Sequence, residues 1–333
     1  MIGEVVREGR MPPWYADPRH GTFLNEPRLT QEERRKIVDW VRGGAKQGDP
    51  AAMPAPLRWP KKKWKISKPD LVVTVRKPVE VPAEGYIPYQ YSSMHLPGPA
   101  GIFPYVFPED TWIQEVQIKA QNTNVLHHAN LAYVLPEKTK GKKVWGRGEE
   151  LFITGQVPGG VPLQLEPGLG FLVPKGAVLV LQMHYVTVGT PMSDRISVGI
   201  VYAKTPIRKR IRHVQVTNKR FRIPPGAPAH EVRAKRTLKN ASSGIGMYVH
   251  MHLRGADIKI SATYPDGEKE TLLVVPNYSF DWQLPYVWKE SKKFPAGTVI
   301  DCVAHFDNSP FNPYNPDPSK RVKFGPQTYH EMM

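Results

Sequence analysis

Two histidine pairs have residue types and spacings that could do chemistry in this sequence. His250 and His252 stand two residues apart in YVHMHLRG, and His127 and His128 are adjacent in NVLHHANLAYV. Side chains at positions i and i+2 of a strand project from the same face, so His250 and His252 could share one metal ion. Adjacent side chains project from opposite faces, so His127 and His128 could share an ion only at a strand end or an irregularity.

A third candidate histidine lies in the long apolar run of residues 177–188. Alternation along a strand puts His184 on the same face as Gln182, and it puts apolar residues such as Met183 on the opposite face. With 11 histidines in 333 residues, about 0.4 pairs are expected by chance at any chosen spacing. Each pair alone therefore favours a structural role. Their occurrence together in strand-like segments, with Met332 in the C-terminal YHEMM, favours metal binding instead.

The candidate ligands form two sets, one of three imidazoles and one of two imidazoles with a thioether. The sets are His127, His128 and His184, and His250, His252 and Met332. Cys302 is the only cysteine, so the chain has no internal disulfide and no thiolate cluster. A thioether favours Cu(I), and neither set has the carboxylate or thiolate ligands that indicate non-haem iron or structural zinc. The sequence therefore predicts two copper ions per chain, with an open position where dioxygen could bind.

Composition and hydrophobic pattern predict an all-β fold that would position these side chains. Glycine (27) and proline (35) interrupt short runs of valine, isoleucine and leucine, as in proteins with many turns between strands. Strands are expected at residues 71–75, 112–119, 125–134, 177–188, 196–203, 246–253, 258–264, 271–275 and 298–306. The sequence YPDG at residues 264–267 predicts a hairpin. This spacing of short strands indicates two tandem antiparallel β-sandwich domains.

The N-terminal residues follow a different pattern. Thr30 and Glu33 form a capping box that predicts a helix start, and Gly43 and Gly44 predict its end. Proline, alanine and lysine then dominate as far as residue 69, which is typical of a linker. We expect a helical segment over residues 1–50, a linker over 51–69, and two sandwich domains over 70–205 and 206–333.

The formal net charge of +16 is concentrated in short basic runs, including KKKWK at residues 61–65 and RKRIR at residues 208–212. Such runs could attract nucleic acid or an anionic membrane. They lie at the expected domain junctions without a nucleic-acid-binding module, which favours solvated linkers. The sequence contains no apolar stretch of 18 residues, so we expect no membrane span, and the first residues lack the apolar region of a signal peptide.

Four of these motifs occur in an order and context that resemble a known family. The series LHHANL, LQMHY, VHMH and HEM is similar to the copper type II, ascorbate-dependent monooxygenases, which include peptidylglycine alpha-hydroxylating and dopamine beta-monooxygenases. The resemblance covers roughly residues 70–333, and the stretch from DNSPFNPYNP to YHEMM is similar to the family's bacterial branch. It implies two jelly-roll-like sandwiches, each carrying one copper, and a periplasmic or secreted location.

The resemblance also implies roles for the candidate ligands. His127, His128 and His184 match the electron-transfer copper, and His250, His252 and Met332 match the catalytic copper. Gln182 matches a residue beside the third histidine of the first site, and we include it among the candidate catalytic residues. Glu331 precedes the ligand methionine as in the family pattern and takes no chemical step.

The reaction implied by the resemblance is hydroxylation of an activated C–H bond. One atom of dioxygen enters a small organic substrate and the other leaves as water, with two electrons supplied one per copper by ascorbate or a similar reductant. Tyr248 stands where the peptide-hydroxylating members have an arginine that helps to hold the substrate carboxylate. This difference argues against peptide substrates.

A separate resemblance concerns the N-terminal segment. RMPPWYADPRHGTF and the helix after it are similar to the end of a cytochrome c domain, in which Met11 would match the axial haem ligand. The chain has no C-x-x-C-H, so we expect no haem in this chain. The resemblance implies an upstream cytochrome c domain as an electron donor.

Two other functions stay open for this sequence. A non-catalytic copper-binding or carbohydrate-binding sandwich would keep the histidines without oxygen chemistry, and a basic scaffold or membrane-surface protein would hold them incidentally. Several further residues fit structural roles better than metal binding. We expect His95, His305 and His330 to be packed, Met251 to point into a core, and Cys302 to be buried.

Overall fold

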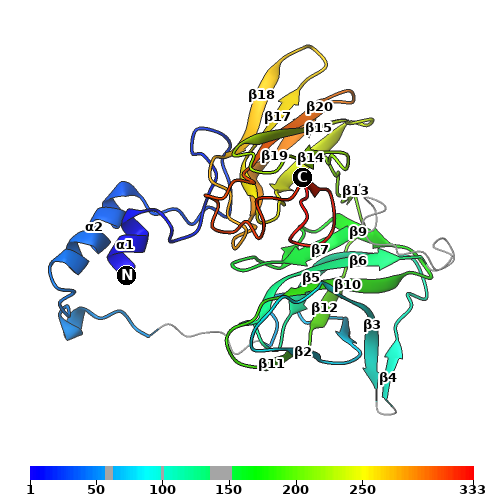
Figure 1. The fold of residues 1–333 in the computed structure, drawn as a ribbon. Coiled ribbons are helices and arrows are strands. Elements are labelled where there is room, and N and C mark those ends of the chain that lie inside the picture. Colours follow the sequence, from blue (N-terminus) through cyan, green and yellow to red (C-terminus); the bar gives the residue numbers. More distant parts are fainter. Residues whose placement is uncertain (57–62, 99–100, 136–151) are drawn as a thin grey trace. The chain divides into compact units, whose positions relative to one another are not determined.

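The computed structural model describes residues 1–56, 63–98, 101–135 and 152–333. Strands in large curled sheets make up most of the regular structure there, so the fold is all-β and sandwich-like, with a short helical segment near the N-terminus (Figure 1). The chain divides into two compact units. The continuous unit consists of residues 62–215, and the discontinuous unit consists of residues 1–61 together with 216–333.

One sheet runs through most of the continuous unit and folds over on itself. Its strands are β1 (Leu71–Val75), β3 (Gln90–Gly98), β4 (Gly101–Pro104), β5 (Thr111–Lys119), β6 (Leu126–Val134), β7 (Phe152–Gln156), β8 (Leu163–Gln164), β9 (Leu169–Val173), β10 (Val178–Tyr185), β12 (Ser197–Tyr202) and β13 (Lys209–Arg210). Their order is β13-β9-β5-β12-β1-β3-β10-β6-β7, with β4 on β3 and β8 on β5. Residues 90–93 of β3 pair with β10 and residues 94–95 pair with β1, so β3 connects the two layers. A separate pair consists of β2 (Val79–Val81) and β11 (Met192–Asp194).

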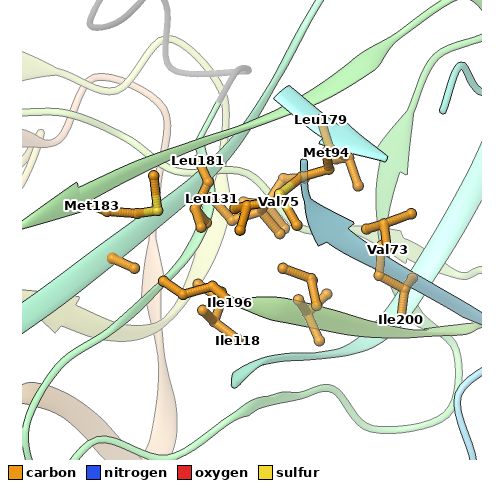
Figure 2. Packing of buried hydrophobic residues seen from close by; sticks show 14 of the residues in the cluster. Val73, Val75, Met94, Ile118, Leu131, Leu179, Leu181, Met183, Ile196 and Ile200 are labelled. Carbon is orange, nitrogen blue, oxygen red and sulfur yellow. The ribbon is translucent and has the colours of Figure 1, made fainter. Parts of the chain in front are cut away.

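The core of this unit lies between the two layers (Figure 2). Leu179, Leu181 and Met183 of β10 have at most 1% of their surface exposed, and Val75 of β1 and Ile118 of β5 belong to the same buried cluster. The alternation predicted for the apolar run is therefore confirmed. The residues between them, including His184, therefore lie on the opposite face of β10.

Replacing Leu181 by alanine should destabilise the continuous unit by about 2–5 kcal/mol, because the fully buried side chain leaves a cavity among close-packed neighbours. The midpoint of urea unfolding measures this loss. Val180→Ala is the matched control, since Val180 is only half-buried on the opposite face of the same strand. An equal loss from both substitutions would contradict the assignment of the core face.

The discontinuous unit contains a four-stranded antiparallel sheet and two strand pairs. Its elements are α1 (Ile2–Arg7), α2 (Gln31–Arg42), the 3-10 turn η1 (Pro50–Ala52), β14 (Arg222–Ile223), β15 (His230–Thr237), β16 (Ser242–Tyr248), β17 (Gly255–Thr263), β18 (Lys269–Val275), β19 (Pro285–Phe294), β20 (Val299–Phe306) and β21 (Val322–Lys323). The sheet has the order β15-β20-β17-β18, and the pairs are β16 with β19 and β14 with β21. The hairpin predicted at YPDG is confirmed, because this turn joins β17 to β18 with Gly267 at a φ of +91°.

Part of the N-terminal segment belongs to the core of the discontinuous unit. Trp14 and Phe23 are buried, and their rings contact each other and Tyr286 edge to face at centroid distances of 5.0–5.8 Å. Phe23 forms a β-bridge with Trp288 of β19, and the Leu24 N–H donates to the Val287 carbonyl. Residues from the start of the chain therefore complete a core built mainly from its last third.

The helix predicted after Thr30 is confirmed. The Thr30 hydroxyl accepts from the Glu33 N–H, the Glu33 carboxylate accepts from the Thr30 N–H, and the helix ends at Arg42 before Gly43. Of the predicted linker, residues 57–62 lie outside the described residues. Closer to β1, the backbone N–H groups of residues 65 and 67 donate to Gln117 and Glu115, which attaches this stretch to β5. No helix in the described part of the chain is both long and apolar enough to cross a membrane.

One predicted strand is wrong in its second half. The sequence pattern predicts a strand over residues 246–253, but β16 ends at Tyr248, so His250 and His252 lie in the connection to β17. Strands β15 and β19 were not expected from the pattern. Both carry many charged side chains, which hide an apolar alternation. Such side chains are compatible with strands that have one neighbour each, β20 for β15 and β16 for β19.

Candidate metal centres

A β-bulge brings the adjacent histidines of β6 to one side. In the antiparallel pairing of β10 with β6, His184 lies opposite His128 while Tyr185 lies opposite Leu126. His127 is therefore an extra residue between two paired positions, which bends the strand and changes the direction of its side chain. This is the irregularity that two consecutive imidazoles need in order to share an ion.

The three imidazoles of the continuous unit form one buried cluster. The ring centroids of His127, His128 and His184 are 5.0–5.3 Å apart, and at most 8% of each residue is exposed. One nitrogen of each ring lies within 4.8 Å of the others, so the cluster could hold a metal ion. The Nδ1 atoms of His127 and His128 are 3.0 Å apart.

Tyr89 and Gln182 lie around this cluster. The buried Tyr89 ring contacts His184 at 4.7 Å and His128 at 5.6 Å between centroids, and it helps to keep water from the imidazoles. Gln182 is buried two residues before His184 on β10, where its amide accepts from Asn130 and donates to the Tyr91 hydroxyl. These two hydrogen bonds link β10, which carries His184, to β6 and β3. Nothing in the sequence around Tyr89 indicated its position.

The second histidine pair lies in the loop between β16 and β17. The rings of His250 and His252 are 5.1 Å apart between centroids, with their planes at 88°. The Nδ1 atom of His250 is 2.7 Å from Oε1 of Gln283, and the Nδ1 atom of His252 is 3.3 Å from the carbonyl oxygen of His330. The two imidazoles converge as expected, although the loop and its hydrogen bonds hold them rather than a regular strand.

Glu331 attaches the C-terminal tail (residues 329–333) to this loop by hydrogen bonds. Its buried carboxylate accepts from the backbone N–H groups of His252 at 2.9 Å and Arg254 at 2.7 Å, and also from that of Met332. Burial raises the pKa of Glu331 to about 8, although the N–H donors oppose this shift. The buried Arg254 side chain adds a hydrogen bond to the carbonyl of Tyr329 at 3.1 Å.

Met332 follows Glu331 directly and is half-buried. Its backbone therefore lies beside the loop that carries His250 and His252. Tyr248, at the end of β16, packs over His250 with ring centroids 6.4 Å apart and planes at 19°, and its hydroxyl donates to Gln283 at 3.3 Å. The phenol of Tyr248 thus lies next to His250 and shares Gln283 with it.

Two other histidines have hydrogen-bond partners outside the two groups. The rings of His95 and His305 bond to the Ser93 carbonyl at 3.0 Å and to the Asp257 carboxylate at 2.8 Å. Met251 is fully buried in the core of the discontinuous unit, as expected. Cys302 is also buried, as expected, and burial raises the pKa of its thiol to about 12, which makes it a poor nucleophile at neutral pH.

No protein-family model and no curated protein sequence matches this chain. The function is therefore inferred from the two groups of side chains. Sequence reasoning missed Tyr89 and Gln283, because each is distant in sequence from the histidines beside it and has no motif of its own. Arg254 is only two residues from His252, but its partners Asn308 and Tyr329 are distant in sequence and gave no signal.

Proposed function

We propose that the chain is a copper-dependent monooxygenase that hydroxylates an activated C–H bond of a small organic substrate with dioxygen and a one-electron reductant such as ascorbate. The main support is the buried cluster of His127, His128 and His184, in which one nitrogen of each imidazole lies within 4.8 Å of the others and no carboxylate of the described residues joins the group. Such a donor set suits copper, and a second group of imidazoles lies in the other unit.

The two groups take different roles in this proposal. The all-imidazole cluster of the continuous unit would hold the electron-transfer copper, with Tyr89 limiting water access. His250, His252 and Met332 would hold the catalytic copper, which binds and reduces dioxygen when present. The thioether of Met332 favours the reduced metal. Gln182 would position His184 through its strand, and Tyr248 would favour substrates without a carboxylate. An upstream cytochrome c domain would be a suitable electron donor in a periplasmic or secreted protein.

The proposal is tested with copper-loaded protein, ascorbate, a panel of small C–H substrates and dioxygen labelled with oxygen-18. We expect a hydroxylated product that carries one labelled atom. Oxygen uptake alone is insufficient, since copper and ascorbate together reduce dioxygen without any enzyme. If copper binds stoichiometrically but no labelled product forms, the alternative of a non-catalytic copper-binding or carbohydrate-binding sandwich is favoured. If copper does not bind stoichiometrically, the alternative of a basic scaffold or membrane-surface protein is favoured.

Replacing Gln182 by alanine should leave two copper ions bound and slow electron delivery. The substitution removes the hydrogen bonds to Asn130 and Tyr91 and leaves all three imidazoles of the cluster in place. Metal analysis and the rate of copper reoxidation measure the two effects. Loss of a copper ion from this variant would mean that Gln182 is itself a ligand.

A further inference from the structure

We propose that Gln283 is a positioning residue that holds the proton of His250 on Nδ1 and so makes Nε2 the metal-binding atom of this imidazole. The tautomer follows from hydrogen-bonding geometry alone, whereas its use in metal binding rests on the proposed function. Gln283 lies between β18 and β19, is 1% exposed, and is 33 residues from His250 in sequence.

The orientation of the Gln283 amide is determined by its partners. Its nitrogen donates to the carbonyl oxygen of Phe280 at 3.2 Å, and a carbonyl oxygen can only accept. The amide oxygen must therefore face the other way, where it lies 2.7 Å from Nδ1 of His250 and 3.3 Å from the Tyr248 hydroxyl. Exchanging the two amide atoms would place two acceptors together at Phe280.

The orientation of the amide fixes the tautomer of His250. An amide oxygen cannot donate, so Nδ1 must carry the hydrogen of the 2.7 Å bond. A neutral imidazole has one N–H, and its lone pair is then on Nε2. His252 should also carry its hydrogen on Nδ1, because this atom faces the backbone carbonyl oxygen of His330 at 3.3 Å. Two independent acceptors thus prepare both rings to bind through Nε2.

Gln283 also restricts the rotation of the His250 ring. The amide is held at both ends, by Phe280 on one side and by Tyr248 and His250 on the other. Hydrogen bonds of this kind orient metal-binding histidines, and their loss typically lowers metal affinity about 10- to 100-fold. The buried position of Gln283 limits competition from water for the same bond.

The test uses nitrogen-15-labelled histidine in the metal-free full chain. We expect long-range nitrogen–proton correlation spectra to show His250 protonated at Nδ1 in the wild type. In Gln283→Leu the Nε2-protonated form should appear. Gln283→Glu retains an oxygen that accepts from Nδ1 but loses the amide N–H that donates to Phe280, so it should restore the Nδ1 form in part. Gln117→Leu, at a buried glutamine of the continuous unit, is the matched control and should leave His250 unchanged.

Affinity for Cu(I) gives the second measurement, with a competing chelator and in a His184→Ala background that isolates the second site. Gln283→Leu should weaken binding about 10- to 100-fold, and Gln283→Glu should recover it in part. A wild-type His250 protonated at Nε2, or a Gln283→Leu protein with unchanged tautomer and affinity, would overturn the proposal. The wild-type spectrum decides the tautomer even if Gln283→Leu does not fold. If the wild type shows the Nδ1 form and no Cu(I) binds, the proposed function fails and the role of Gln283 in metal binding fails with it, while the tautomer assignment holds.

Discussion

The His250→Ala protein is expected to bind one copper ion per chain instead of two and to form no hydroxylated product. The substitution removes one of only two imidazoles in the loop after β16, so the second site keeps His252 and Met332 alone. The cluster of the continuous unit has none of its side chains changed and should remain filled. Metal analysis of the purified protein and product formation with labelled dioxygen measure both effects.

His305→Ala is the matched control for this substitution. His305 belongs to the same unit, but its ring bonds to Asp257 on the neighbouring strand β17. The variant should retain both copper ions and its activity. If His250→Ala also retained two copper ions, the assignment of ligands in the second site would be wrong.

Replacing Glu331 by alanine should detach the C-terminal tail and empty the second site. The carboxylate accepts from the backbone N–H groups of His252, Arg254 and Met332, and leaving buried donors without an acceptor costs about 1–3 kcal/mol each. We expect the free energy of unfolding to fall by about 3 kcal/mol and the copper content to fall by one ion per chain. Denaturant unfolding and metal analysis measure these losses.

Glu331→Gln removes the charge and one of the two accepting oxygens. The amide oxygen can accept from the N–H of His252 or of Arg254, while the amide nitrogen faces the other donor, so this variant should lose less stability and less copper than Glu331→Ala. Equal losses in the alanine and glutamine variants would show that one accepting oxygen is not enough to hold the tail. Full copper content in Glu331→Ala would show that the tail does not contribute to the site.

Strands with a clear alternation of burial could be predicted from sequence. The bounds of β1 agree with the expected residues 71–75, and β10 buries Leu179, Leu181 and Met183 as alternation requires. Strand β15 could not be found in this way, because only Val232 and Ala234 of its residues are buried. The inclusion of Trp14 in a core made by the last third of the chain has no local signal either.

The residue types of the candidate sites could be predicted from the sequence, but most of their geometry could not. Alternation alone predicts that His127 and His128 diverge, and only the bulge in the pairing with β10 brings them together. The convergence of His250 and His252 was expected from a strand, yet a loop produces it. The contacts of Glu331 and Gln283 with this loop link residues 33 to 79 positions apart, a separation at which spacing carries no information.

The split make-up of the discontinuous unit determines the order in which the protein can fold during synthesis. Residues 62–215 emerge from the ribosome as one uninterrupted stretch and can assemble their core at once. Trp14 and Phe23 are made before this stretch but must wait for Tyr286 and Trp288. Until then two large aromatic side chains remain without their native cover, so a nascent chain arrested before residue 286 offers a hydrophobic target to chaperones that the finished protein conceals.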